Sequence, residues 1–194
     1  MTDATLARPE RRTEPDGSTL DVYALPADPD SLEALLRELF ADHWREIVFG
    51  PVIQGAAFEI HVDAPPTHIG LLDGYLTIAF GQTHFHVCIG ETKGPRSRPT
   101  PPELARHRRT ARCELQRRFG GTCVPMSWSL QLFNGGGEQQ LCVLLPNPFL
   151  HPETERLVRE PDWSRLGLWN ALRARWLGLE EEDPLDRLGR GAPQ

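Results

Sequence analysis

The chain has 194 residues, of which 39% are apolar and 25% are charged. These proportions are typical of a globular protein with one sizeable core, and they exclude an intrinsically disordered chain. A net charge of −6 argues against general binding to nucleic acid.

No apolar run in the sequence approaches the roughly 18 residues that a membrane-spanning helix needs, so we expect no membrane partner. The N-terminal region lacks the apolar stretch of a signal peptide, which favours a cytoplasmic protein. In that compartment we expect the cysteines, which form no CxxC pair, to be reduced. They are Cys88, Cys113, Cys123 and Cys142.

Composition divides the chain into three stretches. Residues 1–17 carry proline, arginine and acidic residues with few apolar ones, which predicts a disordered leader. Residues 18–178 are expected to form a single globular domain. Residues 179–194 begin with acidic residues and continue with glycine, proline and arginine, which predicts a flexible tail.

The first half of the predicted domain combines one helix with several strands. Pro29-Asp30-Ser31 supplies a helix start ahead of an apolar stripe at helical spacing. Gly81-Gln82 separates two apolar segments, which predicts a tight antiparallel strand pair. Residues 48–58 stay unassigned. The predicted elements are a strand over 20–25, a helix over 31–45, and strands over 57–62, 71–80 and 84–91.

The second half combines two helices with a hairpin. Pro101-Pro102 favours the first turn of a helix, and an apolar stripe follows at helical spacing. Asn134-Gly-Gly-Gly137 lies between alternating segments, which is a strong hairpin signal. The predicted elements are helices over 103–119 and 162–177 and strands over 128–133 and 139–145.

The predicted order of elements is β-α-β-β-β-α-β-β-α. Short connections between neighbouring strands favour an α+β fold with an antiparallel or mixed sheet covered by two or three helices. A ferredoxin-like elaboration is the preferred form of this fold.

Two histidines and a cysteine recur at every second residue within residues 81–91. His84, His86 and Cys88 would project from one face of a strand, and the apolar residues between them from the other. Imidazole nitrogen and thiolate are ligands that zinc, copper and iron accept. The segment therefore predicts a transition-metal site on one strand face.

Spacing favours the histidine pair within this segment. Residues two apart on a strand lie about 6.5–7 Å apart at Cα, a span over which two long side chains can share an ion. His84 and His86 have this spacing, whereas Cys88 lies about 13 Å from His84 along an ideal strand. Glu91 would turn back over the site if the strand ends at Gly90.

Further ligands would come from other elements. His61 lies on a predicted strand face with two acidic residues, and His107 falls beside the apolar stripe of the predicted helix over 103–119. Solvated polar residues, with the cysteine as a small buried side chain, are the competing interpretation. The predicted site consists of His84, His86 and one of Glu91, His61 or His107.

Arginines crowd the loop and the predicted helix that follow the histidine strand. Arg108, Arg109 and Arg112 would share a face near the start of that helix, where a small anionic ligand would pair with them. The alternative is a solvated helix face. Aromatic residues are not interleaved with these arginines, so binding of single-stranded nucleic acid gains no support.

The run from Gly81 to Gly90, Glu114 and the hairpin segment 133–140 together resemble an uncharacterised family of bacterial proteins that carries an FGxxHFHxCIG segment. The resemblance extends over the folded region. It implies no activity and assigns no role to any residue.

Two other patterns are matched in part. His84-x-His86-x-Cys88 resembles the histidine-triad pattern, which implies attack of a histidine on the phosphorus atom of a nucleotide. A cysteine replaces the third histidine here, and a helix and a hairpin follow where that fold would end. His84-x-His86-x₄-Glu91 matches part of the first cupin motif, but the predicted helices fit a β-barrel poorly.

The sequence therefore predicts a transition-metal-binding protein that holds zinc or iron on its His-x-His strand. An open coordination position would allow metal-assisted hydrolysis or redox chemistry on a small anionic molecule. Glu91 would act as a ligand or general base, and Arg108 or Arg109 would anchor the anion. Enzymatic activity and oligomeric state stay open. The alternatives are a metal-free interaction or scaffold domain and a histidine-triad-like nucleotide hydrolase.

Overall fold

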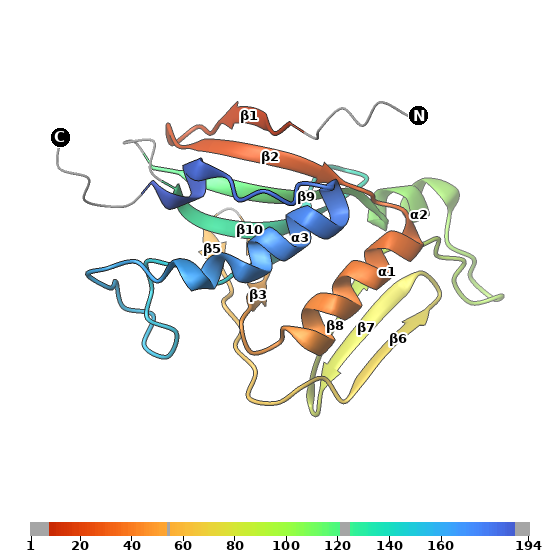
Figure 1. Cartoon of the computed structure of the whole chain (residues 1–194). Helices are drawn as coiled ribbons and strands as arrows, with labels where there is room; N and C mark the ends of the chain where they lie inside the picture. The colour runs from red at the N-terminus through yellow and green to blue at the C-terminus, as the bar shows by residue number, and fades with distance from the viewer. Residues whose placement is uncertain (1–7, 54, 121–124, 189–194) are drawn as a thin grey trace. The chain divides into compact units, whose positions relative to one another are not determined.

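Figure 1 shows a computed structural model of the chain, which describes residues 8–53, 55–120 and 125–188. The chain folds as two compact units. The first contains residues 1–25, 114–130 and 144–194, and the second contains residues 26–113 and 131–143. Strands β9 (Thr110–Phe119) and β10 (Pro125–Asn134) each begin in one unit and end in the other.

Antiparallel strands and three α-helices make up the regular structure of the described chain together with short helical turns, which confirms the predicted α+β class. The other strands are β1 (Glu10–Thr13), β2 (Thr19–Leu25), β3 (Val48–Gly50), β4 (Val52–Ile53), β5 (Ala56–Ala57), β6 (His68–Leu72), β7 (Tyr75–Phe80), β8 (Thr83–Cys88) and β11 (Gln139–Leu144). The α-helices are α1 (Pro29–Arg37), α2 (Pro102–Arg108) and α3 (Gly167–Leu177). The shorter helical turns are η1 (Glu38–Asp42), which is a π-helix, and the 3-10 turns η2 (Trp163–Leu166) and η3 (Pro184–Arg187). Across residues 8–53, 55–120 and 125–188, no helix has both the length and the apolar character needed to span a membrane.

The first unit is a sheet with α3 packed on it (Figure 1). Hydrogen bonding orders its strands β1-β2-β9-β10. Trp169 of α3 is fully buried and meets Tyr23 of β2 edge to face, with ring centroids 5.9 Å apart. Trp128 of β10 is also fully buried and stacks on Phe149. Aromatic side chains therefore form much of the core of this unit.

A buried cluster of charges lies in the same unit. Arg117 of β9 is fully buried, and its guanidinium group pairs with Asp21 at 2.7 Å and with Asp183 and Asp186 at 2.8 Å. Burial alone would lower the pKa of Arg117, but the three carboxylates raise it above its ordinary value. An isolated buried charge costs several kcal/mol, so these carboxylates permit an arginine at this position.

Asp186 of η3 joins the C-terminal segment to this cluster. Its carboxylate accepts hydrogen bonds from Nε1 of Trp128 at 2.8 Å, from Nε1 of Trp169 at 2.9 Å and from Arg117 at 2.8 Å. The side chain of Asp186 is only 2% exposed. The flexible tail predicted over 179–194 therefore contains an ordered turn whose carboxylate belongs to the core.

The second unit carries the histidine segment. β6, β7 and β8 form one antiparallel sheet, whereas β11 and β3 continue the six-stranded sheet whose order is β1-β2-β9-β10-β11-β3. α1 and η1 lie against β7 and β8 (Figure 1). Phe40 of η1 contacts Phe49, Phe80 and Phe85, with ring centroids between 4.9 and 6.3 Å apart. This aromatic cluster covers one face of the β6-β7-β8 sheet.

The strand predicted over 71–80 is in fact the end of β6, a turn and β7. Leu72 pairs with Tyr75, so Asp73 and Gly74 form a two-residue turn in which both have positive φ, 47° and 79°. Positive φ at both positions is the mark of a type I′ turn, for which Asp-Gly is a preferred sequence. The predicted pairing of β7 with β8 across Gly81-Gln82 is confirmed.

The helix predicted over 103–119 is wrong beyond Arg108. α2 ends there, and β9 begins at Thr110. Residues 113–117 are all buried in β9, so the strand lacks the polar-apolar alternation by which a half-exposed strand is identified. Burial of its charged residues depends on ion pairs with residues that are distant in the sequence, such as Arg12 with Glu114.

The strand predicted over 57–62 is wrong: β5 ends at Ala57, and beyond it only Ile60 forms an isolated bridge, with Phe49. The other predicted elements are found with small shifts. The helix predicted over 31–45 is α1 with η1, the helix over 162–177 is η2 with α3, and the predicted hairpin is β10 with β11. The disordered leader predicted over 1–17 contains a strand, because Glu10–Thr13 pair with β2.

Candidate functional site

One face of the β6-β7-β8 sheet, opposite the aromatic cluster, carries the predicted histidine pair. Directly paired residues of antiparallel strands project to the same side, and successive residues along a strand alternate. Strand pairing therefore defines a surface of three cross-strand rows, which we call the histidine face. The first row is His68, Ala79 and His84, the second is Gly70, Thr77 and His86, and the third is Leu72, Tyr75 and Cys88.

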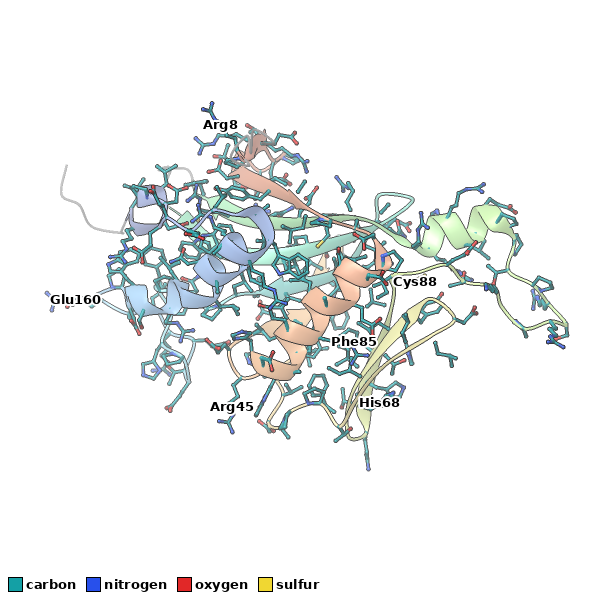
Figure 2. All side chains as sticks on the ribbon, turned by 45° about the vertical axis from the view of Figure 1, so that its right-hand side comes forward. Arg8, Arg45, His68, Phe85, Cys88 and Glu160 are labelled. Carbon is teal, nitrogen blue, oxygen red and sulfur yellow. The ribbon has the colours of Figure 1, made fainter. Side chains whose placement is uncertain are left out.

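His84 and His86 are exposed neighbours on this face. The centroids of their rings lie 5.2 Å apart, and the ring planes meet at 74°. Nδ1 of His86 lies 2.7 Å from Oγ1 of Thr77 in the adjacent strand. Phe85 (Figure 2), between the two histidines, contacts Phe40 of η1 on the other face of the strand. The strand alternation predicted from the sequence therefore separates the imidazoles from the core.

A third histidine, which the sequence pattern does not connect to the pair, lies on the same face. His68 of β6 is exposed. A Cβ added at Gly70 would lie 2.5 Å from Nε2 of His68, so the imidazole rests over this glycine. The Asp73-Gly74 turn is the signal that could have located His68, because it folds β6 beside β7.

Cys88 lies at the opposite end of the histidine face from His68 (Figure 2) and is buried. Its thiol donates to the carbonyl oxygen of Gly90 at 3.6 Å. Burial raises the pKa of Cys88, although the positive charges of Arg108 and Arg109 act to lower it. A buried thiol with a raised pKa is a poor ligand and nucleophile near neutral pH, so packing accounts for Cys88.

The arginines are arranged differently from the prediction. Arg108 ends α2 and Arg109 follows it. The next residue, Thr110, donates its hydroxyl to the carbonyl oxygen of Cys88 at 2.9 Å, so this part of the backbone lies beside the end of β8. Arg112 lies on β9, with its guanidinium carbon 4.2 Å from the centroid of the Phe133 ring. The three arginines therefore share no helix face, and only Arg108 and Arg109 remain candidates for an anion beside the histidine face.

His107 contacts the β10–β11 hairpin. Its Nε2 lies 3.3 Å from the carboxylate of Glu138, and its backbone carbonyl accepts a hydrogen bond from the amide of Gly135 at 2.9 Å. A hydrogen bond from Asn134, together with the charge of His107, lowers the pKa of Glu138. These contacts indicate that His107 holds α2 against the hairpin.

The other predicted ligands do not complete a ready-made site. Glu91 is exposed just beyond β8, and His61 is exposed beside the isolated pairing of Ile60 with Phe49. Among the described residues, no three His, Cys, Asp or Glu side chains are arranged to hold a metal ion as they lie. A metal ion would therefore bind to the histidine pair with waters, or it would require a side chain to rotate.

Two of the remaining cysteines lie in the core. Cys113 and Cys142 are buried, and burial raises the pKa of Cys142 to about 11 in spite of a hydrogen bond from Gln131. Cys123 lies outside the described residues.

Comparison with known proteins gives a family but no activity. The chain matches a family described as one of unknown function (DUF7676) over residues 9–178. It matches none of the curated proteins with which it was compared.

Proposed function

The chain belongs to this family of unknown function, so membership supplies no activity, and we propose from the geometry that the protein binds a transition-metal ion at His84 and His86. The ion would be zinc or iron, both of which accept imidazole ligands. Both side chains are exposed, so an ion reaches them without opening the core.

The separation of the two rings carries the proposal. A zinc ion lies about 2 Å from a coordinating imidazole nitrogen, and therefore about 3.2 Å from the ring centroid. Two imidazoles at the tetrahedral angle on one ion would thus have centroids about 5.2 Å apart. The rings of His84 and His86 have a centroid separation of 5.2 Å. Rotation of the His84 ring would direct its nitrogen at an ion on His86 without moving the strand or the contact of His86 with Thr77.

Thr77 supports the same assignment. Histidines that bind metals usually form a hydrogen bond through the second ring nitrogen, which fixes the tautomer and the ring orientation. Oγ1 of Thr77 lies 2.7 Å from Nδ1 of His86, which leaves Nε2 as the nitrogen for the ion.

A two-histidine site leaves coordination positions for water and for a substrate. Such a site suits metal-assisted hydrolysis or redox chemistry. Arg108 and Arg109 directly precede Thr110, whose hydroxyl bonds to the carbonyl oxygen of Cys88, one row from His86, so a small anionic molecule bound to the ion would meet positive charge at that end of the face. Glu91 is retained as a candidate general base.

Three finer assignments accompany this proposal. We place the protein in the cytoplasm, where buried thiols such as Cys88 and Cys142 stay reduced. We also propose that members of the family share the segment 80–90 and come from bacteria.

Metal analysis of tag-free protein tests the proposed function. Protein incubated with zinc or iron(II) and then desalted should retain metal near one equivalent, and the His84→Ala/His86→Ala double variant should not. His151→Ala, which removes another exposed histidine, is the matched control and should retain the metal. Circular dichroism checks that each variant is folded. Wild-type protein that retains no metal would reject the proposal, and nucleotide-ester turnover that survives chelation would favour the histidine-triad alternative.

A further inference from the structure

We infer that the outer edge of β6 pairs with the β6 strand of a second copy of this chain, which makes the protein a two-fold symmetric dimer. The pairing involves no metal ion, so it goes beyond the proposed function. β6 ends the strand order β6-β7-β8 and is the outermost strand of this sheet in Figure 1. An edge strand presents backbone N–H and C=O groups that another strand can pair with.

The pairing of β6 with β7 determines which backbone groups of β6 face outward. In a two-residue hairpin the residues beside the turn exchange hydrogen bonds, so Leu72 directs its N–H and C=O groups toward Tyr75 of β7. Bonded and non-bonded pairs alternate along the strands, so Ile69 and Leu71 direct their groups away from β7. The guanidinium group of Arg37 in α1 donates to the carbonyl oxygen of Ile69 at 3.2 Å, as expected for an oxygen that faces outward. That oxygen can accept a second hydrogen bond.

β6 lacks the features by which edge strands usually avoid pairing. Such strands carry a lysine, a proline, an inward-pointing charge or a bulge. Residues 68–72 contain no proline and no acidic or basic residue except His68, and they pair with β7 in unbroken register. Leu71 is 44% exposed and Leu72 is 78% exposed. Although the chain has a net charge of −6, two copies can therefore meet at this edge through an apolar segment without acidic side chains.

One antiparallel register makes this edge complementary to itself. With Gly70 opposite Gly70 of the second copy, Ile69 lies opposite Leu71, and the outward groups of these two residues exchange hydrogen bonds on both sides of the axis. Their side chains meet on the face of the aromatic cluster, while Leu72 lies beside His68 on the histidine face. Both exposed leucines are thus covered by the copy's own strand. Gly70 has no side chain to oppose the close approach of the strands at the axis.

Sedimentation velocity of tag-free protein tests this pairing. The weight-average mass should rise from that of a monomer toward that of a dimer between about 1 and 200 μM, as expected for a small interface. Leu71→Ala and Leu71→Pro are a matched pair, because both shorten the side chain but only proline removes the outward N–H group. Proline is tolerated at such an edge position, and it should weaken dimerisation at least about 10-fold more than alanine does. Leu72→Ser should also weaken dimerisation, whereas Leu157→Ser, which replaces another exposed leucine, should leave it unchanged.

Amide hydrogen exchange in the wild-type protein tests the same edge without a substitution. The amides of Ile69 and Leu71 should exchange more slowly at high protein concentration than at low concentration. Far-ultraviolet circular dichroism should show that each variant is folded. Wild-type protein that stays monomeric at about 200 μM would overturn the pairing, and so would a dimer in which neither Leu71→Pro nor concentration changes these results. Growth beyond a dimer would also overturn it, because β6 of one copy would then pair with another edge of the next copy without closing.

Discussion

Replacing Asp186 by alanine should destabilise the first unit strongly. The carboxylate of Asp186 accepts from two buried indole groups and pairs with the buried Arg117, and its own side chain is 2% exposed. Alanine provides no acceptor, so the Nε1 donors of Trp128 and Trp169 would lose this partner inside the core. Arg117 would keep Asp21 and Asp183 as partners.

The size of the effect follows from these contacts. A buried donor left without a partner costs about 1–3 kcal/mol, so the two indoles together cost about 2–6 kcal/mol. Removing one partner of a buried ion pair costs about 3–5 kcal/mol when the remaining charge is left alone. Because Arg117 retains two carboxylates, the cost of an unpaired charge does not apply in full, and we expect a loss near the middle of the range for the two indoles, about 4 kcal/mol. That is a large share of the roughly 5–15 kcal/mol by which proteins are stable.

Urea unfolding followed by tryptophan fluorescence measures this loss. Trp44 lies in the second unit and the other four tryptophans lie in the first, so the signal reports mainly on the unit that contains Asp186. Arg187→Ala is the matched control: it removes a neighbouring side chain that is 50% exposed and paired with Glu182, and it should cost less than about 1 kcal/mol. If the free energy of unfolding of Asp186→Ala lies within about 1 kcal/mol of the wild-type value, the buried cluster does not stabilise the first unit.

Three further results are expected. Burial acts to raise the pKa of Asp21, but hydrogen bonds from two arginines outweigh it and lower the pKa below its ordinary value. The stability that this carboxylate confers should therefore be present above about pH 4 and lost as the pH falls through the lowered pKa. Asp21→Asn should flatten the acid limb of a stability profile measured by urea unfolding. Burial raises the pKa of Cys142 to about 11, so iodoacetamide at mildly alkaline pH should modify it only after unfolding, and peptide mass mapping of modified Cys142 in native protein would contradict this. Gly50→Ala should lower the free energy of unfolding by about 2 kcal/mol, because a Cβ there would lie 2.1 Å from the backbone oxygen of Phe58. A Cβ at Gly167 would meet nothing within 4 Å, so Gly167→Ala should be neutral or stabilising. Thermal unfolding measures both effects.

Local sequence patterns were sufficient to predict an element wherever the pattern matches the way in which that element packs. The C-terminal helix follows from its apolar spacing, and the hairpin around 134–137 follows from its turn residues. The alternation of His84 and His86 with Phe85 also matched the strand, because one face packs on an aromatic cluster and the other meets solvent.

The sequence was insufficient where burial depends on partners from elsewhere. β9 contains Glu114 and Arg117 in buried positions. Its sequence therefore lacks the polar-apolar alternation of a half-exposed strand, and a helix was the simpler interpretation. His68 was missed for a related reason. Its place beside Ala79 depends on the pairing of β6 with β7, and a single histidine before the Asp73-Gly74 turn has no spacing that connects it to His84.

The division of the chain into interleaved units has a consequence for its synthesis. All residues of the second unit precede residue 144, so this unit can complete its structure while the C-terminal region is still being translated. The first unit needs Asp186, which leaves the ribosome late, and until then Trp128, Trp169 and Arg117 have no access to that carboxylate. Translation that stops before this residue should therefore yield a chain whose histidine face is formed but whose first unit is exposed to chaperones and proteases.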